Sequence, residues 1–130
     1  MGYLLDTSFL IGIIREESNA LKIFETLLNN DSDFFTCPIS ITQILSKVRK
    51  NENFLKIRIF LFFFQVINVN SEISFKAGQL GYDLARKCIT IPDTDDLIIN
   101  ILCQENDLTL ITSNLKHFPN KNIKILEYKY

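Results

Sequence analysis

Three short polar segments carry the residues of this sequence that are best suited to chemistry. Asp6 follows the apolar run 3–5, an acidic group lies at 93–96, and residues 112–114 (Thr-Ser-Asn) follow the apolar run 108–111. Carboxylate and amide oxygens are the ligands that Mg²⁺ and Mn²⁺ prefer. Carboxylates that share a crevice repel one another unless a cation neutralises them. If the fold brings these segments together, they predict a metal site able to activate water against a phosphate ester.

The same residues also suit simple structural roles. An aspartate directly before a helix caps its free N–H groups, which is one interpretation of Asp6. Acidic residues in a first helical turn interact favourably with the helix dipole, which is one interpretation of Asp93, Asp95 and Asp96. The functional interpretation gains support because carboxylates recur at both places, so the positions of the strands and helices decide between the two.

Short apolar runs alternate with amphipathic segments along the whole chain. Because the runs are apolar throughout rather than alternating, they predict a parallel sheet covered by helices on both faces. The expected architecture is a three-layer α/β fold with four or five strands. The ends of four strands then meet at one edge, which brings together Asp6, the helix that begins at Ser40, the acidic group 93–96 and residues 112–114. The expected strands are 3–5, 34–39, 66–69, 108–111 and 123–126, and the expected helices are 9–14 (capped by Thr7 or Ser8), 19–30, 40–50 (capped by Ser40), 53–64, 71–87 (capped by Ser71) and 93–105.

The length, the net charge and the cysteine spacing limit the classes of protein to which this sequence can belong. A chain of 130 residues predicts one domain spanning 1–130, and 14 basic against 15 acidic residues leave no overall positive field for nucleic acid. Three cysteines without a paired spacing indicate reduced thiols in a cytoplasmic protein. No segment has the length or flanking charges of a signal peptide or membrane span.

The sequence resembles a known family at four places. These are LLDTSFLIG at 4–12, AGQLGYDLARK at 77–87, PDTDDLIIN at 92–100 and LITSNLKHF at 110–118. In this order they are similar to the marked blocks of PIN-domain ribonucleases, above all the VapC-type toxins of prokaryotic toxin–antitoxin pairs. The resemblance implies a sheet with the first strand central and an endoribonuclease that uses Mg²⁺ or Mn²⁺. It also implies a small antitoxin partner and a homodimer.

The resemblance also assigns roles to single residues. Asp6 matches the first acid, a metal ligand, and Asp95 matches the acid of the family's D-x-L-I-A-A helix. Thr112 and Asn114 match its T-x-[DN] segment, in which Asn114 contributes an amide without charge. The family places a glutamate where this chain has Gln43, which is neutral and cannot act as a base. Weaker metal binding or lost catalysis follows, so a degenerate PIN domain that binds protein or RNA without cutting is the alternative. Asp93 and Asp96 are substitute acids.

Other features support weaker interpretations. A haloacid-dehalogenase-like phosphatase would need an aspartate where Ser8 stands. His117 is the one histidine, and we expect it to cap or pack near Phe118 rather than catalyse. A basic cluster is either a solvated face or an RNA contact, and it consists of Lys47, Arg49, Lys50, Lys56 and Arg58. We expect close helix packing at Gly78 and Gly81. The run 60–64 (FLFFF) is either core or a partner surface.

Overall fold

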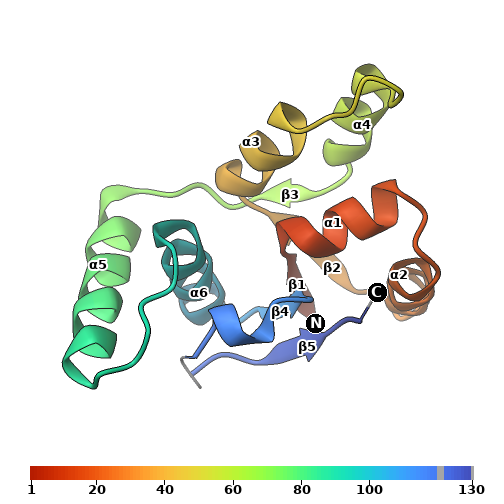
Figure 1. Cartoon of the computed structure of the whole chain (residues 1–130). Helices are drawn as coiled ribbons and strands as arrows, with labels where there is room; N and C mark the ends of the chain where they lie inside the picture. The colour runs from red at the N-terminus through yellow and green to blue at the C-terminus, as the bar shows by residue number, and fades with distance from the viewer. Residues whose placement is uncertain (120–121, 130) are drawn as a thin grey trace.

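The computed structural model describes residues 1–119 and 122–129. Within them, five strands form one all-parallel sheet in the order β3-β2-β1-β4-β5, with β1 at its centre (Figure 1). The predicted α/β class and the central first strand are therefore confirmed. The strands are β1 (Gly2–Leu5), β2 (Asp33–Thr36), β3 (Gln65–Val66), β4 (Thr109–Thr112) and β5 (Ile125–Glu127). The helices are α1 (Thr7–Ile14), α2 (Ser18–Asn29), α3 (Pro38–Ser46), α4 (Phe54–Leu61), α5 (Ser71–Arg86), α6 (Thr94–Asn106) and the short 3₁₀ helix η1 (Leu115–His117).

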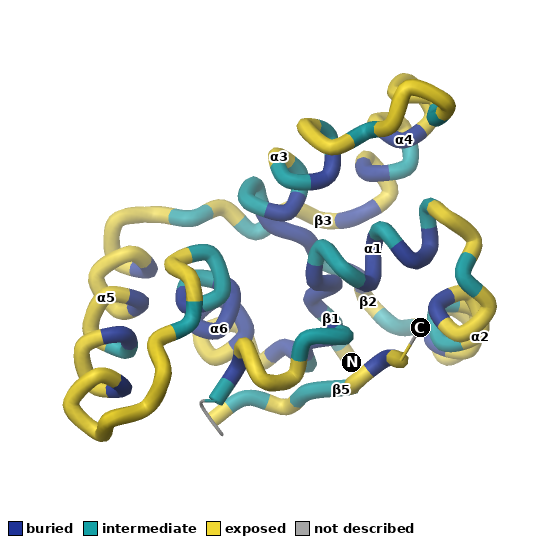
Figure 2. The backbone as a smooth tube through the Cα atoms, viewed as in Figure 1, coloured by how far each residue is buried: buried dark blue, intermediate teal, exposed yellow. Residues whose placement is uncertain are grey.

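The sheet separates two hydrophobic clusters, which makes the fold three layers thick. Successive strand residues point to opposite faces, so Leu4 of β1 packs with α5 and α6 while Leu5 packs with α1, α2 and α4. Leu110 and Ile111 of β4 divide in the same way. Figure 2 shows the buried residues of α5 and α6 turned toward each other and toward the sheet. Because each central strand is buried on both faces, its sequence reads as a continuous apolar run.

Three helices have N-caps that lie before the predicted ones. The N-cap of α1 is Asp6 rather than Thr7 or Ser8, because its Oδ1 accepts the Thr7 N–H at 2.8 Å. The N-cap of α3 is Cys37, and Pro38 supplies the fixed backbone angle of the first turn, so Ser40 lies inside that helix. The N-cap of α5 is Asn70, whose Oδ1 accepts the Ile73 N–H at 2.9 Å.

The aromatic run 60–64 divides between the core and the surface. Leu61 and Phe64 are buried, whereas Phe62 and Phe63 are 72% and 58% exposed. Helix α4 ends at Leu61 instead of continuing to Phe64. The strand expected at 66–69 is present only as the two residues of β3, Gln65 and Val66. The exposed apolar residues of this region, called the α4 face below, are Leu55, Ile59, Phe62, Phe63 and Val66. No described helix is long and apolar enough to cross a membrane.

Gly12 marks the closest approach between α1 and its neighbours. A Cβ atom there would lie 2.5 Å from the Tyr128 hydroxyl and 3.0 Å from the Ala20 Cβ. Tyr128 is buried, and its ring packs edge-on against Phe9. Gly81 is similar, since its Cβ would meet Leu97 at 3.0 Å. Gly78 is different, because nothing lies within 4 Å of its Cβ position, so the close packing expected there is absent.

We predict that Gly12→Ala lowers the free energy of unfolding by about 1–3 kcal/mol, because the new methyl group must displace Tyr128 or α2. The matched control is Gly78→Ala, also in a helix interior, which should raise the same quantity by about 0.5–1 kcal/mol through helix propensity alone. Urea unfolding of dilute protein measures both. Equal effects of the two substitutions would contradict the packing described here.

Candidate active site

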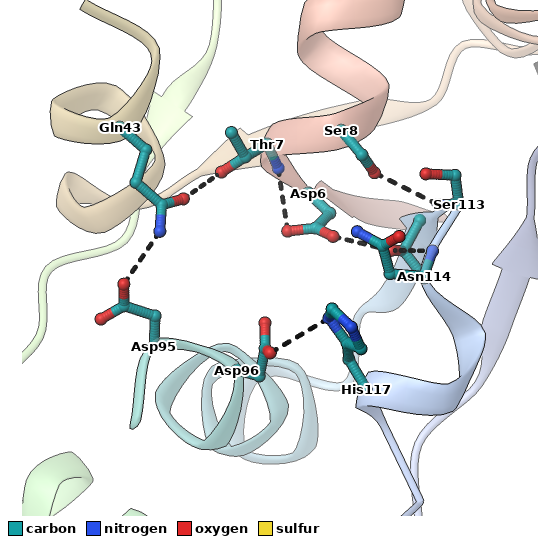
Figure 3. Close-up of polar contacts among 10 residues, drawn as sticks. Asp6, Thr7, Ser8, Gln43, Asp95, Asp96, Ser113, Asn114 and His117 are labelled. Atoms are coloured by element: carbon teal, nitrogen blue, oxygen red, sulfur yellow. Dashed lines mark hydrogen bonds and ion pairs between the residues drawn. The ribbon is translucent and has the colours of Figure 1, made fainter. Parts of the chain in front are cut away.

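Asp6 stands at the junction of β1 and α1, at the carboxyl edge of the sheet. Its carboxylate is buried, and each oxygen accepts one hydrogen bond (Figure 3). Oδ1 accepts from the Thr7 backbone N–H at 2.8 Å, and Oδ2 accepts from the Thr112 hydroxyl at 2.6 Å. Because β1 and β4 are adjacent and parallel, Thr112 reaches Asp6 from the end of the neighbouring strand. Asp6 is thus the cap of α1, and its carboxylate also lies at the edge of the sheet where the end of β4 meets it.

The segment after β4 is fixed against the same strand end. The Asn114 backbone N–H donates to Thr112 Oγ1 at 3.0 Å, and the Ser113 N–H donates to Ser8 Oγ at 3.2 Å. Figure 3 places the Asn114 side chain beside Asp6. The predicted proximity of Asp6, Thr112 and Asn114 is therefore present in the structure.

Gln43 of α3 bridges two other elements. Its Nε2 donates to Asp95 Oδ2 at 2.8 Å, and its Oε1 accepts from the Thr7 hydroxyl at 2.5 Å. That hydroxyl also lies 3.1 Å from Ser40 Oγ, so the first turn of α3 helps to position it. These partners determine the orientation of the amide, because its nitrogen must donate to the Asp95 carboxylate and its oxygen must accept from the Thr7 hydroxyl. A single neutral side chain thus connects α1, α3 and α6.

Asp96 points from the first turn of α6 into the space between Asp6 and His117 (Figure 3). Its Oδ2 lies 3.3 Å from His117 Nδ1. Burial first, and then the charge of Asp6, raise the pKa of Asp96 to about 6, although the nearby His117 opposes this shift. Burial likewise raises the pKa of Asp6, and the hydrogen bonds from Thr112 and Thr7 counteract it. The site therefore holds more negative charge than its own donors compensate.

Sequence analysis missed several contributors to this arrangement. Thr7 and Ser8 were considered only as caps, yet they position Gln43 and Ser113. His117 also pairs with Asp96, a contact that the sequence does not predict. The position of His117 within the segment LITSNLKHF at 110–118 is the sequence signal that points to it. An open pocket of about 430 Å³ lies beside the pair and is lined by Thr90, Ile91, Pro92, Asp93, Asp96, Lys116 and His117.

The donor set fits a hard divalent cation. Asp6, Asp95 and Asp96 offer carboxylate oxygens, and the amide of Asn114 lies beside them. Over residues 1–119 and 122–129, no three His, Cys, Asp or Glu side chains are close enough to enclose a metal ion. Mg²⁺ does not need such a cage, because it commonly keeps several waters and binds through one or two carboxylates plus substrate phosphate. The raised pKa values of Asp6 and Asp96 are also what an uncompensated cation site produces.

We predict that the metal-free protein loses stability as the pH rises from about 4 to about 6. The folded pKa of Asp96, about 6, exceeds its ordinary value of 3.8, so ionisation in this interval disfavours the folded state. Asp6 acts in the same direction. Asp96→Asn should remove about 1 kcal/mol of the decline, a modest amount because the adjoining pocket is open to solvent. Urea unfolding at several pH values with EDTA measures this, and an unchanged slope in the variant would contradict it.

Comparisons with known proteins agree with this geometry. The PIN domain family model matches residues 3–123. Ribonuclease VapC2 of Rickettsia felis is 30% identical over 131 aligned residues, which cover 98% of this chain and 97% of that protein.

Solved structures share the fold. VapBC2 from Rickettsia felis, bound to a promoter DNA fragment, contains a chain that superposes with a TM-score of 0.82 at 23% identity, covering 99% of this chain and 100% of that one. DNA-bound VapBC from Salmonella typhimurium gives 0.79 at 20% identity, with 98% of both chains covered. The family model covers the segments that contain Asp6 and Asp96, and Ribonuclease VapC2 aligns with nearly the whole chain. This chain therefore belongs to the PIN domain family.

Proposed function

We propose that this chain is a VapC-type endoribonuclease that hydrolyses RNA phosphodiester bonds with a divalent cation, Mg²⁺ or Mn²⁺. The observation that carries the proposal is the convergence of Asp6, Asp95 and Asp96 at one edge of a parallel sheet. The similarity to Ribonuclease VapC2 supports the reaction class. We further propose that residues 1–130 act as one domain and that the protein works in the reducing cytoplasm, a proposal that the free Cys37, Cys88 and Cys103 support.

Each side chain has a distinct part in this proposal. Asp6 and Asp95 hold the cation, and Asp96 adds a third carboxylate that faces Asp6. When bound, the cation activates water and stabilises negative charge on the phosphoryl oxygens. Thr112 keeps the Asp6 carboxylate in place through its hydroxyl, and Asn114 orients water or a ligand through its neutral amide.

The open pocket next to Asp96 is the place for the RNA strand. Lys116 and His117 line it together with Asp93 and Asp96, and offer donors to backbone phosphates. With a net charge of −1 the chain has no general attraction for RNA, so these local contacts and the cation must provide the binding energy.

A small antitoxin is the proposed protein partner. The structurally similar chains from Rickettsia felis and Salmonella typhimurium come from VapBC complexes. In this chain the α4 face supplies exposed apolar side chains, and two of them, Phe62 and Val66, line a hollow of about 250 Å³. A peptide with alternating apolar and acidic side chains suits this surface, because Arg58 lines the hollow and stacks over Phe62.

One specific observation favours a second function, a PIN domain that binds protein or RNA without cutting. Gln43 contributes no charge, and its amide engages the Asp95 carboxylate that a cation would need. Asn114 likewise provides an amide where a carboxylate would add charge. If these neutral groups lower the cation affinity too far, only the binding role remains.

The first test is RNA cleavage by the purified chain in Mg²⁺ or Mn²⁺. We predict cleavage that Asp6→Asn reduces by about 100-fold or more, because asparagine keeps the helix cap but removes the charge that holds the cation. Asp33→Asn, an exposed aspartate at the start of β2, is the matched control and should cleave like the native chain. Cleavage that persists in Asp6→Asn would sink the proposal, and silence of both the native chain and Gln43→Glu on a broad RNA panel would favour the binding role.

The second test concerns Gln43. We predict that Gln43→Glu binds Mn²⁺ about tenfold more tightly and cleaves RNA faster, because it adds a carboxylate next to Asp95. The same variant should be less stable than the native chain in EDTA, since two carboxylates then face each other. Gln43→Ala frees the Asp95 carboxylate without adding charge, so its affinity should rise above the native value but less than that of Gln43→Glu. Calorimetric titration with Mn²⁺ measures all three proteins, and equal affinity of Gln43→Glu and the native chain would refute the role given to Gln43.

A further inference from the structure

The pocket beside Asp96 has features that contact with a backbone phosphate does not explain. Its volume is about 430 Å³, and it lies between the loop that connects α5 to α6 and the 3₁₀ helix η1. Pockets of roughly 300–1,000 Å³ that combine apolar walls with a few polar groups are typical of sites for small organic groups. The side chains that line this pocket therefore indicate which part of an RNA strand fits it.

Two side chains of the pocket offer surfaces on which a flat ring can pack. Ile91 is 51% exposed, and its Cγ2 lies 3.9 Å from the position of a Cβ atom at Gly81, so the side chain rests against α5. The imidazole of His117 is 45% exposed, and its Nδ1 lies 3.3 Å from Asp96 Oδ2, which fixes one edge of the ring (Figure 3). Unstacked RNA bases commonly pack on aromatic side chains, and histidine is one of them.

Asp93 is the polar group of this pocket whose orientation the fold does not explain. It occupies the N-cap of α6, where an aspartate usually accepts a helix N–H, yet its carboxylate makes no such hydrogen bond. Its backbone carbonyl still accepts the Leu97 N–H at 3.1 Å, so the first turn of the helix is closed without the side chain. The side chain is exposed and lines the pocket instead. Asp93 therefore offers both carboxylate oxygens to a ligand as acceptors.

A carboxylate repels a phosphate and attracts N–H donors, so it suits a base rather than the backbone of RNA. Guanine matches a carboxylate best, because its N1–H and N2–H donors lie side by side. Adenine and cytosine each present an amino group beside a ring-nitrogen acceptor, and uracil presents its N–H between carbonyl oxygens. With these bases, one oxygen of the carboxylate would face an acceptor.

We infer that this pocket is a guanine-selecting subsite for single-stranded RNA, in which the Asp93 carboxylate accepts from N1–H and N2–H while Ile91 and His117 pack on the ring. Lys116 lines the same pocket and remains available to the neighbouring phosphate. Because Asp96 belongs both to the pocket and to the acidic site, the guanine lies at one fixed position next to the cleaved bond. The inference rests on the proposed function for its substrate, and it makes Asp93 a specificity-determining residue.

Cleavage of a randomised single-stranded RNA pool in Mn²⁺, followed by sequencing of the product ends, tests this selection. The native chain should enrich guanine about tenfold or more at one position next to the cut, because a good bidentate contact discriminates against other bases by about that much. Asp93→Asn should lose this enrichment and favour adenine, because an amide offers the donor and acceptor that adenine matches. The preference is a ratio within one protein, so a change in cation affinity or in overall rate does not alter it.

The matched control is Asp107→Asn, which makes the same change at an exposed aspartate at the other end of α6. It should keep the native preference for guanine. Asp93→Asn should unfold at the native temperature, because the Asp93 side chain makes no capping hydrogen bond that the substitution could remove. Thermal unfolding followed by circular dichroism verifies this.

Nucleotide binding in EDTA tests the same contact without catalysis. Guanosine monophosphate and inosine monophosphate carry the same phosphate and differ only in the N2 amino group. NMR titration of the isotope-labelled chain should show that guanosine monophosphate binds about tenfold more tightly. It should also shift the amide signals of residues 90–93, 116 and 117, which line the pocket. Asp93→Asn should bind the two nucleotides about equally.

Equal affinity of the native chain for the two nucleotides would overturn the inference, and so would a guanine preference that Asp93→Asn retains. Cleavage without a preference for guanine would overturn it too, while leaving the proposed nuclease intact. Conversely, selective binding of guanosine monophosphate by a chain that cleaves no RNA would support the subsite and count against the nuclease.

Discussion

The burial of the Asp6 carboxylate is the constraint on which the rest of the site depends. A buried charge is tolerated only when hydrogen-bond donors or opposite charges compensate it. The Thr7 N–H exists as a donor because α1 begins at once after β1, and the Thr112 hydroxyl reaches Asp6 because β4 lies next to β1. The central position of β1 is thus a requirement of the site as well as a property of the sheet.

The hydrogen bonds to Asp6 compensate its buried charge only in part, so uncompensated negative charge remains in the site. Two donors offset part of the cost of burying Asp6, yet its pKa remains raised, and its charge adds to the burial that brings the pKa of Asp96 to about 6. The metal-free fold therefore contains an electrostatic cost that a more neutral sequence would avoid. In the proposed function a divalent cation would remove this cost, so the free energy that destabilises the metal-free site would become affinity for the ion.

The sequence predicts the elements well because their physical causes are local. Apolar runs mark strands that are buried on both faces, and polar residues directly after them mark the edge where Asp6 and Asn114 meet. The contacts between side chains in the site could not be predicted in the same way. That Asp96 faces Asp6 while Asp95 faces Gln43 depends on how α6 is rotated against the sheet, which no local pattern encodes. The exposure of Phe62 and Phe63 depends likewise on where α4 ends, and a run of aromatic residues does not define that point.

Gln43 shows how stability and ion binding oppose each other within one side chain. Its amide donates to the Asp95 carboxylate and accepts from the Thr7 hydroxyl, so both of its polar ends are satisfied without a metal. A glutamate would keep the contact with Thr7 but would present an acceptor to an acceptor, 2.8 Å apart at the present geometry. Such a pair is stable only with a shared proton or a cation between the oxygens. The amide therefore stabilises the metal-free site and lowers its affinity for an ion, whereas the buried charge of Asp6 raises that affinity. Under the proposed function, the balance between these two residues would determine whether the chain cleaves RNA or only binds it.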